Sequence, residues 1–155
     1  MPYLRSDWHQ HLTDVWGEYK SARVAVDRLK AAVAATPDIF KKDSEEHKYL
    51  RKAHKNLEGT YIVRLFAAFE AAIRSYDRVT HNDPKRETAA SVMIDQIGGK
   101  RGRGIGTGIR VDAHGVRQVR NYWAHESDED PGPMTIHEAS RRLQHYLSEL
   151  PDEWG

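Results

Sequence analysis

The chain of 155 residues contains no cysteine, which excludes disulfides, thiolate metal sites and a cysteine nucleophile together. It also has no apolar run close to the roughly 18 residues that a membrane-spanning helix needs. The first residues, MPYLRSDWHQ, lack the basic segment followed by an apolar one that is typical of a signal peptide. We therefore expect a cytoplasmic protein that makes no contact with a membrane.

An excess of charge of either sign is lacking as well. The 24 lysines and arginines nearly balance 23 acidic residues, so the formal net charge is +1. This balance argues against a disordered chain and against tight, charge-driven binding to long RNA. A chain of this length suits one domain whose folding buries roughly two thirds of its unfolded surface. We predict a single domain over residues 1–155.

The alternation of apolar and polar residues that is typical of strands appears nowhere, whereas apolar residues recur at steps of three and four. This spacing predicts a first helix from an N-cap at Ser6 to about Thr36, because Pro37 disfavours helical backbone at the residue before it. A second helix is predicted over about 44–79. Asp83 followed by proline is a suitable cap for a shorter helix that ends near residue 97.

Helical spacing resumes at about Asp112 in the last third of the chain. Thr135 and Glu138 have the spacing of a capping box and precede the apolar residues of a last helix, which runs to about Leu150. The whole pattern predicts an all-α fold, a bundle of four to five helices.

Between these helices, residues 98–110 read GGKRGRGIGTGIR, with six glycines, four basic residues and no acid. We predict a flexible, basic, glycine-rich loop. It is not a P-loop, because Lys100 is followed by Arg101 where that motif needs serine or threonine. Lys100, Arg101 and Arg103 are candidate contacts to a nucleic-acid backbone, the alternative being plain solvated flexibility. Neither the histidine spacings nor the acidic run 126–130 matches a metal site, so no metal or cofactor is expected.

The hexamer RNYWAH at residues 120–125 carries the most specific polar pattern. On an ideal helix His114, Arg117, Asn121 and His125 share one stripe. Arg120 borders this stripe, but it lies roughly 140° from His125 around the helix. The two side chains can cooperate if the helix distorts near its end, or if two copies of the helix face each other across a twofold axis.

The order R-N-x-x-x-H late in a small helical chain resembles the motif of the HEPN superfamily, with Arg120, Asn121 and His125 in its three positions. A second similarity lies in RLFAAFEAAI, residues 64–73, where Glu70 takes the place of an acidic residue among apolar ones. The resemblance implies a HEPN-like helical bundle that commonly dimerises. Many such domains are metal-independent endoribonucleases that act as toxins or in antiviral defence, and others are binding modules.

The chemistry that this resemblance implies suits the residue types. Imidazole titrates near neutral pH, so His125 can move the proton of an attacking 2′-hydroxyl or a leaving 5′-oxygen. The planar fork of Arg120 can stabilise the developing negative charge. Asn121 would orient the phosphate or the histidine, its alternative being a surface amide. Glu70 would pair with a motif arginine or with Arg74, four residues later.

Two further residues are candidates for binding the substrate. Arg117 could bind a substrate phosphate, or pair with Glu70 instead. Tyr122 could stack on a base, whereas the neighbouring Trp123 falls on the apolar side of the helix and is expected in the core.

The sequence thus predicts a homodimeric HEPN ribonuclease that cuts RNA and leaves a cyclic phosphate. A neutralising antitoxin or another regulatory protein is a possible partner. Two alternatives stay open at this point. One is a non-catalytic HEPN-like module that binds a nucleotide, RNA or a protein, and the other is a helical interaction protein unrelated to this superfamily.

Overall fold

The computed structural model describes residues 4–125 and 129–155, and these residues form five helices and no strand. The helices are α1 (Arg5–Ala35), α2 (Glu45–Thr80), α3 (Ala90–Gln96), α4 (Thr107–His125) and α5 (Ile136–Ser148). The predicted all-α fold of four to five helices is therefore confirmed. Among the described residues, none of the helices combines the length and the apolar composition that spanning a membrane requires.

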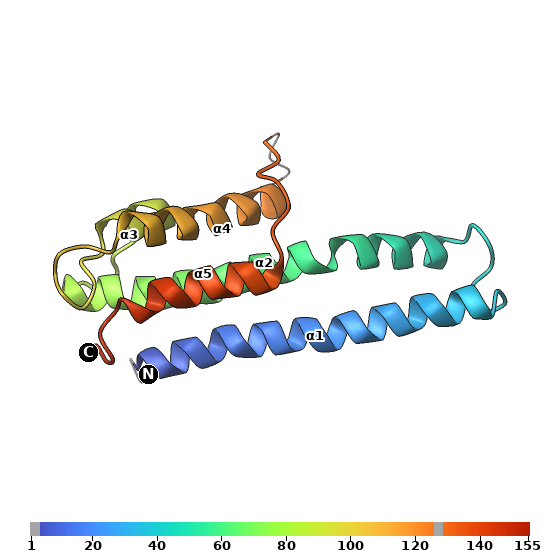
Figure 1. Ribbon diagram of the computed structural model, residues 1–155, viewed down its shortest axis with the longest axis horizontal. Coiled ribbons are helices and arrows are strands. Elements are labelled where there is room, and N and C mark those ends of the chain that lie inside the picture. The colour runs from blue at the N-terminus through green and yellow to red at the C-terminus, as the bar shows by residue number, and fades with distance from the viewer. Residues whose placement is uncertain (1–3, 126–128) are drawn as a thin grey trace.

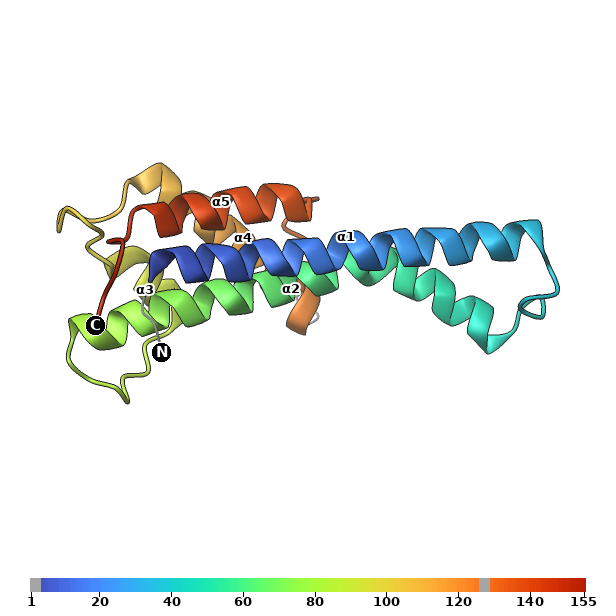
Figure 2. The ribbon, with the colours of Figure 1, turned by 90° about the horizontal axis from the view of Figure 1, so that it is seen from below.

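The two longest helices, α1 and α2, run antiparallel, and the other three pack along only part of their length (Figure 1). The helices α4 and α5 lie beside the C-terminal half of α2, and α3 lies at the same end of the molecule. The remainder of α1 and α2 extends beyond this bundle as a two-helix arm (Figure 2). We define the arm as residues 20–58, beyond the ring contacts of Trp16 with His137 and of Tyr19 with Tyr61. Only one part of α2 is therefore covered on several sides.

The core consists of apolar side chains from all five helices within the bundle. Its fully buried members include Leu12, Ile62, Leu65, Phe66, Phe69, Ile73, Met93, Ile94, Val116, Leu143, Tyr146 and Leu147. The Tyr146 ring packs edge-on against Phe69, and its hydroxyl donates to the carbonyl of Ile94 at 2.9 Å. In the arm only Val33 and Leu50 are buried hydrophobics. The bundle is therefore where most of the hydrophobic stabilisation arises.

Some helix ends lie where prolines and capping side chains in the local sequence place them, and others do not. The helix α1 ends just before Thr36 and Pro37, and the Ser44 hydroxyl caps α2 by accepting from the His47 N–H at 3.3 Å. The predicted cap at Ser6 is wrong, because α1 already begins at Arg5 without a side-chain cap. The Arg5 guanidinium donates to the carbonyl of Leu150 at 2.7 Å, so a contact distant in sequence holds this helix start.

The third helix is shorter than predicted, since α3 begins only at Ala90. The segment 81–89 before it is held in an irregular conformation by Asp77, whose side chain is buried. The Asp77 carboxylate accepts from Arg86 Nε at 2.9 Å and from the Thr88 hydroxyl at 3.0 Å. A buried carboxylate needs such partners, and a helix starting at Pro84 would not preserve this arrangement.

The glycine-rich segment also differs from its prediction. Helix α4 begins at Thr107, not near Asp112, so residues 107–110 of the expected loop are helical. The remaining loop is held against the end of α5 by two hydrogen bonds of Lys100. Its backbone N–H donates to the carbonyl of Glu149 at 2.7 Å, and its side-chain ammonium donates to the carbonyl of Ser148 at 3.0 Å. Ile105 is buried. One buried side chain and two hydrogen bonds thus turn a segment of loop-like composition into a packed connection.

The predicted capping box at the start of α5 is half formed. The Thr135 hydroxyl accepts from the Glu138 N–H at 3.1 Å, as expected of an N-cap. The Glu138 carboxylate instead accepts hydrogen bonds from Arg141 and Arg142, which lower its pKa to about 2. Glu138 is thereby kept as an anion beside two cations of α5.

Two glycines inside long helices give a matched test of helix packing. A Cβ at Gly59 in α2 would lie 2.2 Å from Cδ2 of the Trp123 indole, whereas a Cβ at Gly17 in α1 would meet no atom within 4 Å. Alanine at position 17 is expected to stabilise the protein by about 1 kcal/mol through helix propensity. Alanine at position 59 is expected to cost about 1–2 kcal/mol net, because overpacking outweighs that gain.

The free energies of unfolding of the two variants, from urea titrations, test this expectation. Equal stabilisation by Gly17→Ala and Gly59→Ala would mean that the indole leaves α2 at no cost and does not fix the end of α4.

Candidate functional site

The motif arginine, Arg120, lies on the side of α4 that packs against α2. Its guanidinium carbon is 4.8 Å from the centre of the Phe66 ring, and Nη2 is 3.6 Å from Oε2 of Glu70. The contacts of α4 on either side of Arg120 fix this orientation, because Val116 and Val119 are buried in the core and Trp123 lies on Gly59 of α2. Arg120 is thus positioned by an aromatic face below it and a carboxylate beside it.

Glu70 is shared between two arginines. Its Oε1 accepts from Nη2 of Arg74 at 2.7 Å, and Nη1 of Arg74 donates to the carbonyl of Thr88 at 3.1 Å. The two pairings proposed for Glu70, with a motif arginine and with Arg74, therefore both occur. The pairing of Glu70 with Arg117 does not.

Arg120 keeps most of its hydrogen-bonding capacity free. Its Nε is buried and has no partner in the described part of the chain. The contact to Glu70, at 3.6 Å, is longer than a hydrogen bond and contributes mainly charge attraction. The side chain is 22% exposed, so part of this fixed cation can be reached from solvent although its Nε is covered.

His125 is the last residue of α4, and it is exposed. Among the described residues it has no hydrogen bond or ion pair. On a regular helix it lies roughly 140° from Arg120, so one chain directs the two side chains to different sides of α4. Asn121 and Tyr122 between them are half-buried, and the Tyr122 ring contacts Trp123 edge-on at 5.5 Å. Trp123 itself is 39% exposed, although it was expected in the core.

Arg117 belongs to a separate network of polar contacts on the same helix. Its Nε donates to Nδ1 of His114 at 3.3 Å, and Nε2 of His114 lies 2.9 Å from Oδ1 of Asp95. His114 is therefore fixed between an acid of α3 and an arginine one turn further along α4. Arg117 is half-buried, and one of its donors is engaged by this imidazole.

The basic loop residues lie far from the hexamer. Lys100, Arg101 and Arg103 precede the first residue of α4, and the 19 residues of this helix separate its two ends by roughly 27 Å (Figure 1). Lys100 is bonded to the end of α5, while Arg101 and Arg103 are exposed. The predicted substrate-binding residues thus form two groups, and only the group on α4 adjoins the motif.

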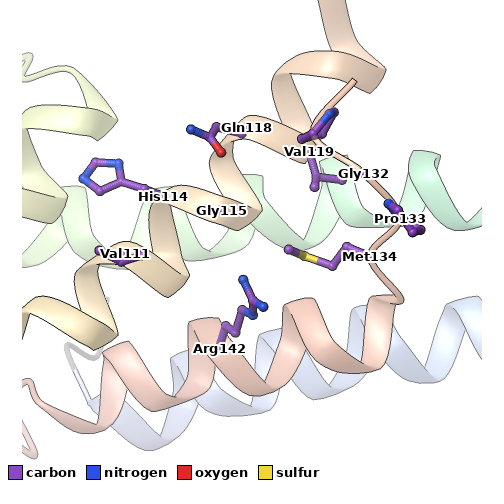
Figure 3. A pocket seen from close by; sticks show the side chains of 10 residues that line it. Val111, His114, Gly115, Gln118, Val119, Gly132, Pro133, Met134 and Arg142 are labelled. Carbon is purple, nitrogen blue, oxygen red and sulfur yellow. The ribbon is translucent and has the colours of Figure 1, made fainter. Parts of the chain in front are cut away.

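A pocket of about 500 Å³ lies between α4, α5 and residues 131–134 (Figure 3). Its lining includes His114, Gly115, Met134 and Arg142. Arg142 packs against Gly115, where a Cβ would lie 2.9 Å from Nη1, and its Nε donates to Glu138 at 2.7 Å. The charge of this arginine is compensated by Glu138, and Asp112 lies 3.8 Å from its Nη1, so the lining of the pocket offers no uncompensated arginine. It lies on the opposite side of α4 from Arg120.

The described residues contain no group of three histidine or acidic side chains placed to hold a metal ion. Comparisons with known proteins found no matching family model, no similar curated protein and no similar solved structure. A functional proposal therefore rests on the motif and on the geometry around it.

Sequence reasoning missed two features of this site. Phe66, which supports Arg120, lies four residues before Glu70 and so on the same face of α2, a spacing that could have indicated it. The second is a row of cations on the first turns of α2, at Lys48, Arg51, Lys52 and Lys55. The spacing i, i+3, i+4, i+7 is visible in the sequence, but its position relative to α4 is not.

Proposed function

We propose that this protein is a metal-independent endoribonuclease of the HEPN type. The observation that carries the proposal is the state of Arg120, which is held on Phe66 and Glu70 while most of its donors remain unused. An arginine kept in place but not consumed by hydrogen bonds is suited to a phosphate. The R-N-x-x-x-H order, with His125 exposed five residues later, adds a proton-transfer group.

In the proposed reaction the 2′-oxygen of a ribose attacks the adjacent phosphorus, and the bond from phosphorus to the 5′-oxygen breaks. The products are a 2′,3′-cyclic phosphate and a 5′-hydroxyl. His125 transfers the proton that leaves the 2′-hydroxyl or the proton that reaches the 5′-oxygen. Arg120 stabilises the charge on the phosphorane, and Asn121 orients the phosphate by hydrogen bonding.

A homodimer completes this site. Because Arg120 and His125 diverge by roughly 140° around α4, two copies related by a twofold axis can place the arginine of one beside the histidine of the other. Each dimer then has two composite sites. The wider role as a toxin or antiviral effector, restrained by an antitoxin or regulatory partner, is implied by the same resemblance.

The first experiment is RNA cleavage by the purified protein in EDTA, with the cut ends identified by mass spectrometry. Wild-type protein is expected to cut single-stranded RNA and leave a cyclic phosphate. A His125→Ala preparation of equal dimer content, purified in parallel, controls for a contaminating nuclease and is expected to be nearly inactive. If wild type cuts no RNA, or the variant cuts equally well, the alternative of a non-catalytic binding module replaces this proposal.

A further inference from the structure

Helix α2 extends well past the end of the helix that covers its functional face. Gly59, Phe66 and Glu70 mark that face, because Trp123 packs on the first and Arg120 contacts the other two. Helix α4 ends at His125, while α2 continues toward its N-terminus to Glu45 (Figure 1). The first turns of α2 therefore present this face without α4 above it.

Cations occupy that uncovered continuation. At 100° per residue, Lys48, Lys52 and Lys55 all lie within roughly 40° of the direction of Gly59, and Arg51 borders them. All four side chains are exposed. We call Lys48, Arg51, Lys52 and Lys55 the lysine stripe.

The other side of the same turns is occupied by α1. Leu50 is buried, and His54 Nε2 lies 3.2 Å from Asp27 of α1. Both residues lie roughly 140–180° from Gly59 around α2. The stripe therefore points away from α1, along the surface that leads to Trp123 and Arg120.

The charge of the stripe is poorly compensated. Lys52 and Lys55 form no ion pair with any described residue, Lys48 lies 3.8 Å from Glu45, and Arg51 contacts the ring of His47. The arm, residues 20–58, contains ten lysines and arginines against six acids, an excess of four positive charges in a chain whose net charge is +1. Within the arm's part of α2, residues 45–58, there are four lysines and arginines against three acids, and all four of these cations belong to the stripe.

We propose that the lysine stripe binds the sugar-phosphate backbone of single-stranded RNA that continues from the cleavage point. Lys48 and Gly59 are separated by roughly 16 Å of helix, so the stripe extends the site along the strand. Aromatic rings flank both ends, with Tyr49 61% and Trp123 39% exposed. A row of cations beside exposed aromatic rings is the usual surface for single-stranded nucleic acid.

The inference rests on the proposed function, because it assumes that the bound strand is the RNA that is cut. Binding of the strand can nevertheless be measured without cleavage. The probe is a single-stranded RNA of about 12 nucleotides with a 2′-O-methyl group at every position, which cannot be cut. Each lysine that neutralises a phosphate contributes about −0.7 to the slope of log affinity against log salt.

The double variant Lys52→Gln/Lys55→Gln is expected to make this slope shallower by about 1.4, which corresponds to about 25-fold weaker binding at 0.1 M salt. The matched control is Lys41→Gln/Lys42→Gln, which removes the same charge from the exposed turn between α1 and α2. The control is expected to keep most of the wild-type slope. Because all four lysines are exposed, the thermal unfolding midpoints should agree and verify folding.

Two outcomes of the RNA titrations would overturn the inference: an unchanged salt slope in the stripe variant, or an equal change of slope in the control variant. A third would come from a parallel binding assay with phosphatidylserine vesicles, if the stripe variant lost vesicle binding while its RNA binding stayed intact. The last would identify a membrane surface. A changed slope in a protein that never cuts RNA refutes only the proposed reaction. Cleavage together with an unchanged slope refutes only the role of the stripe.

Discussion

An equal mixture of Arg120→Ala and His125→Ala chains is expected to regain about a quarter of wild-type RNA cleavage, since half of the dimers are then mixed and each has one intact site. Each variant alone should lose about 10²–10³-fold or more, because one lacks the charge at the phosphorane and the other the proton-transfer group. The mixed dimer combines Arg120 of one chain with His125 of the other.

The measurement is the cleavage rate after the two variants have been co-expressed, with the fraction of mixed dimers counted by native mass spectrometry. A second mixture, of His125→Ala with the double variant Arg120→Ala/His125→Ala, has no histidine at either site and should stay inactive. Mixed dimers without regained activity would show that Arg120 and His125 do not act in a composite site between chains.

Replacing Arg120 by lysine is expected to reduce the cleavage rate by about 10²–10³-fold, although the charge is retained. A lysine ammonium lacks the flat surface that lies on Phe66 and the fork of donors that fits a phosphate. The variant should fold, because the side chain is partly exposed and Glu70 keeps its 2.7 Å hydrogen bond with Arg74.

Arg110 offers a closely matched control on the same helix. Its Nη1 lies 3.7 Å from Asp95, its side chain is 31% exposed, and its Nε is buried without a partner in the described ranges, as in Arg120. Arg110→Lys should leave the cleavage rate nearly unchanged. Equal losses in both lysine variants, measured in the same RNA assay, would mean that these arginines support α4 and that Arg120 has no special role at the phosphate.

Local signals predicted the parts of the fold that depend on a few neighbouring residues. Apolar spacing identified the long helices and the approximate start of α2, Pro37 the end of α1, and the hydroxyl of Thr135 the start of α5. The start of α4 was predicted five residues too late, because glycine-rich composition in residues 98–110 is typical of loops. There, hydrogen bonds to α5 and the burial of Ile105 override the local preference.

The geometry of the site depends on contacts that no local pattern contains. The motif itself and the 140° divergence of Arg120 and His125 follow from order and helix geometry alone. The support of Arg120 by Phe66, and its contact with Glu70, arise only where α4 crosses α2. Likewise, Asp77 shortens α3 through hydrogen bonds to residues nine and eleven positions later.

By itself, therefore, the sequence determined that this protein is helical, where most of its helices begin and end, and which side chains share a stripe on α4. Tertiary structure alone decided which face of each helix is covered and which stays open to a ligand. The lysine stripe illustrates the difference. The spacing of its four residues can be read from the local sequence, whereas its exposure beside the motif arises because α4 ends at His125 while α2 continues. Helix periodicity is set by short-range backbone geometry, whereas coverage is set by packing between distant segments.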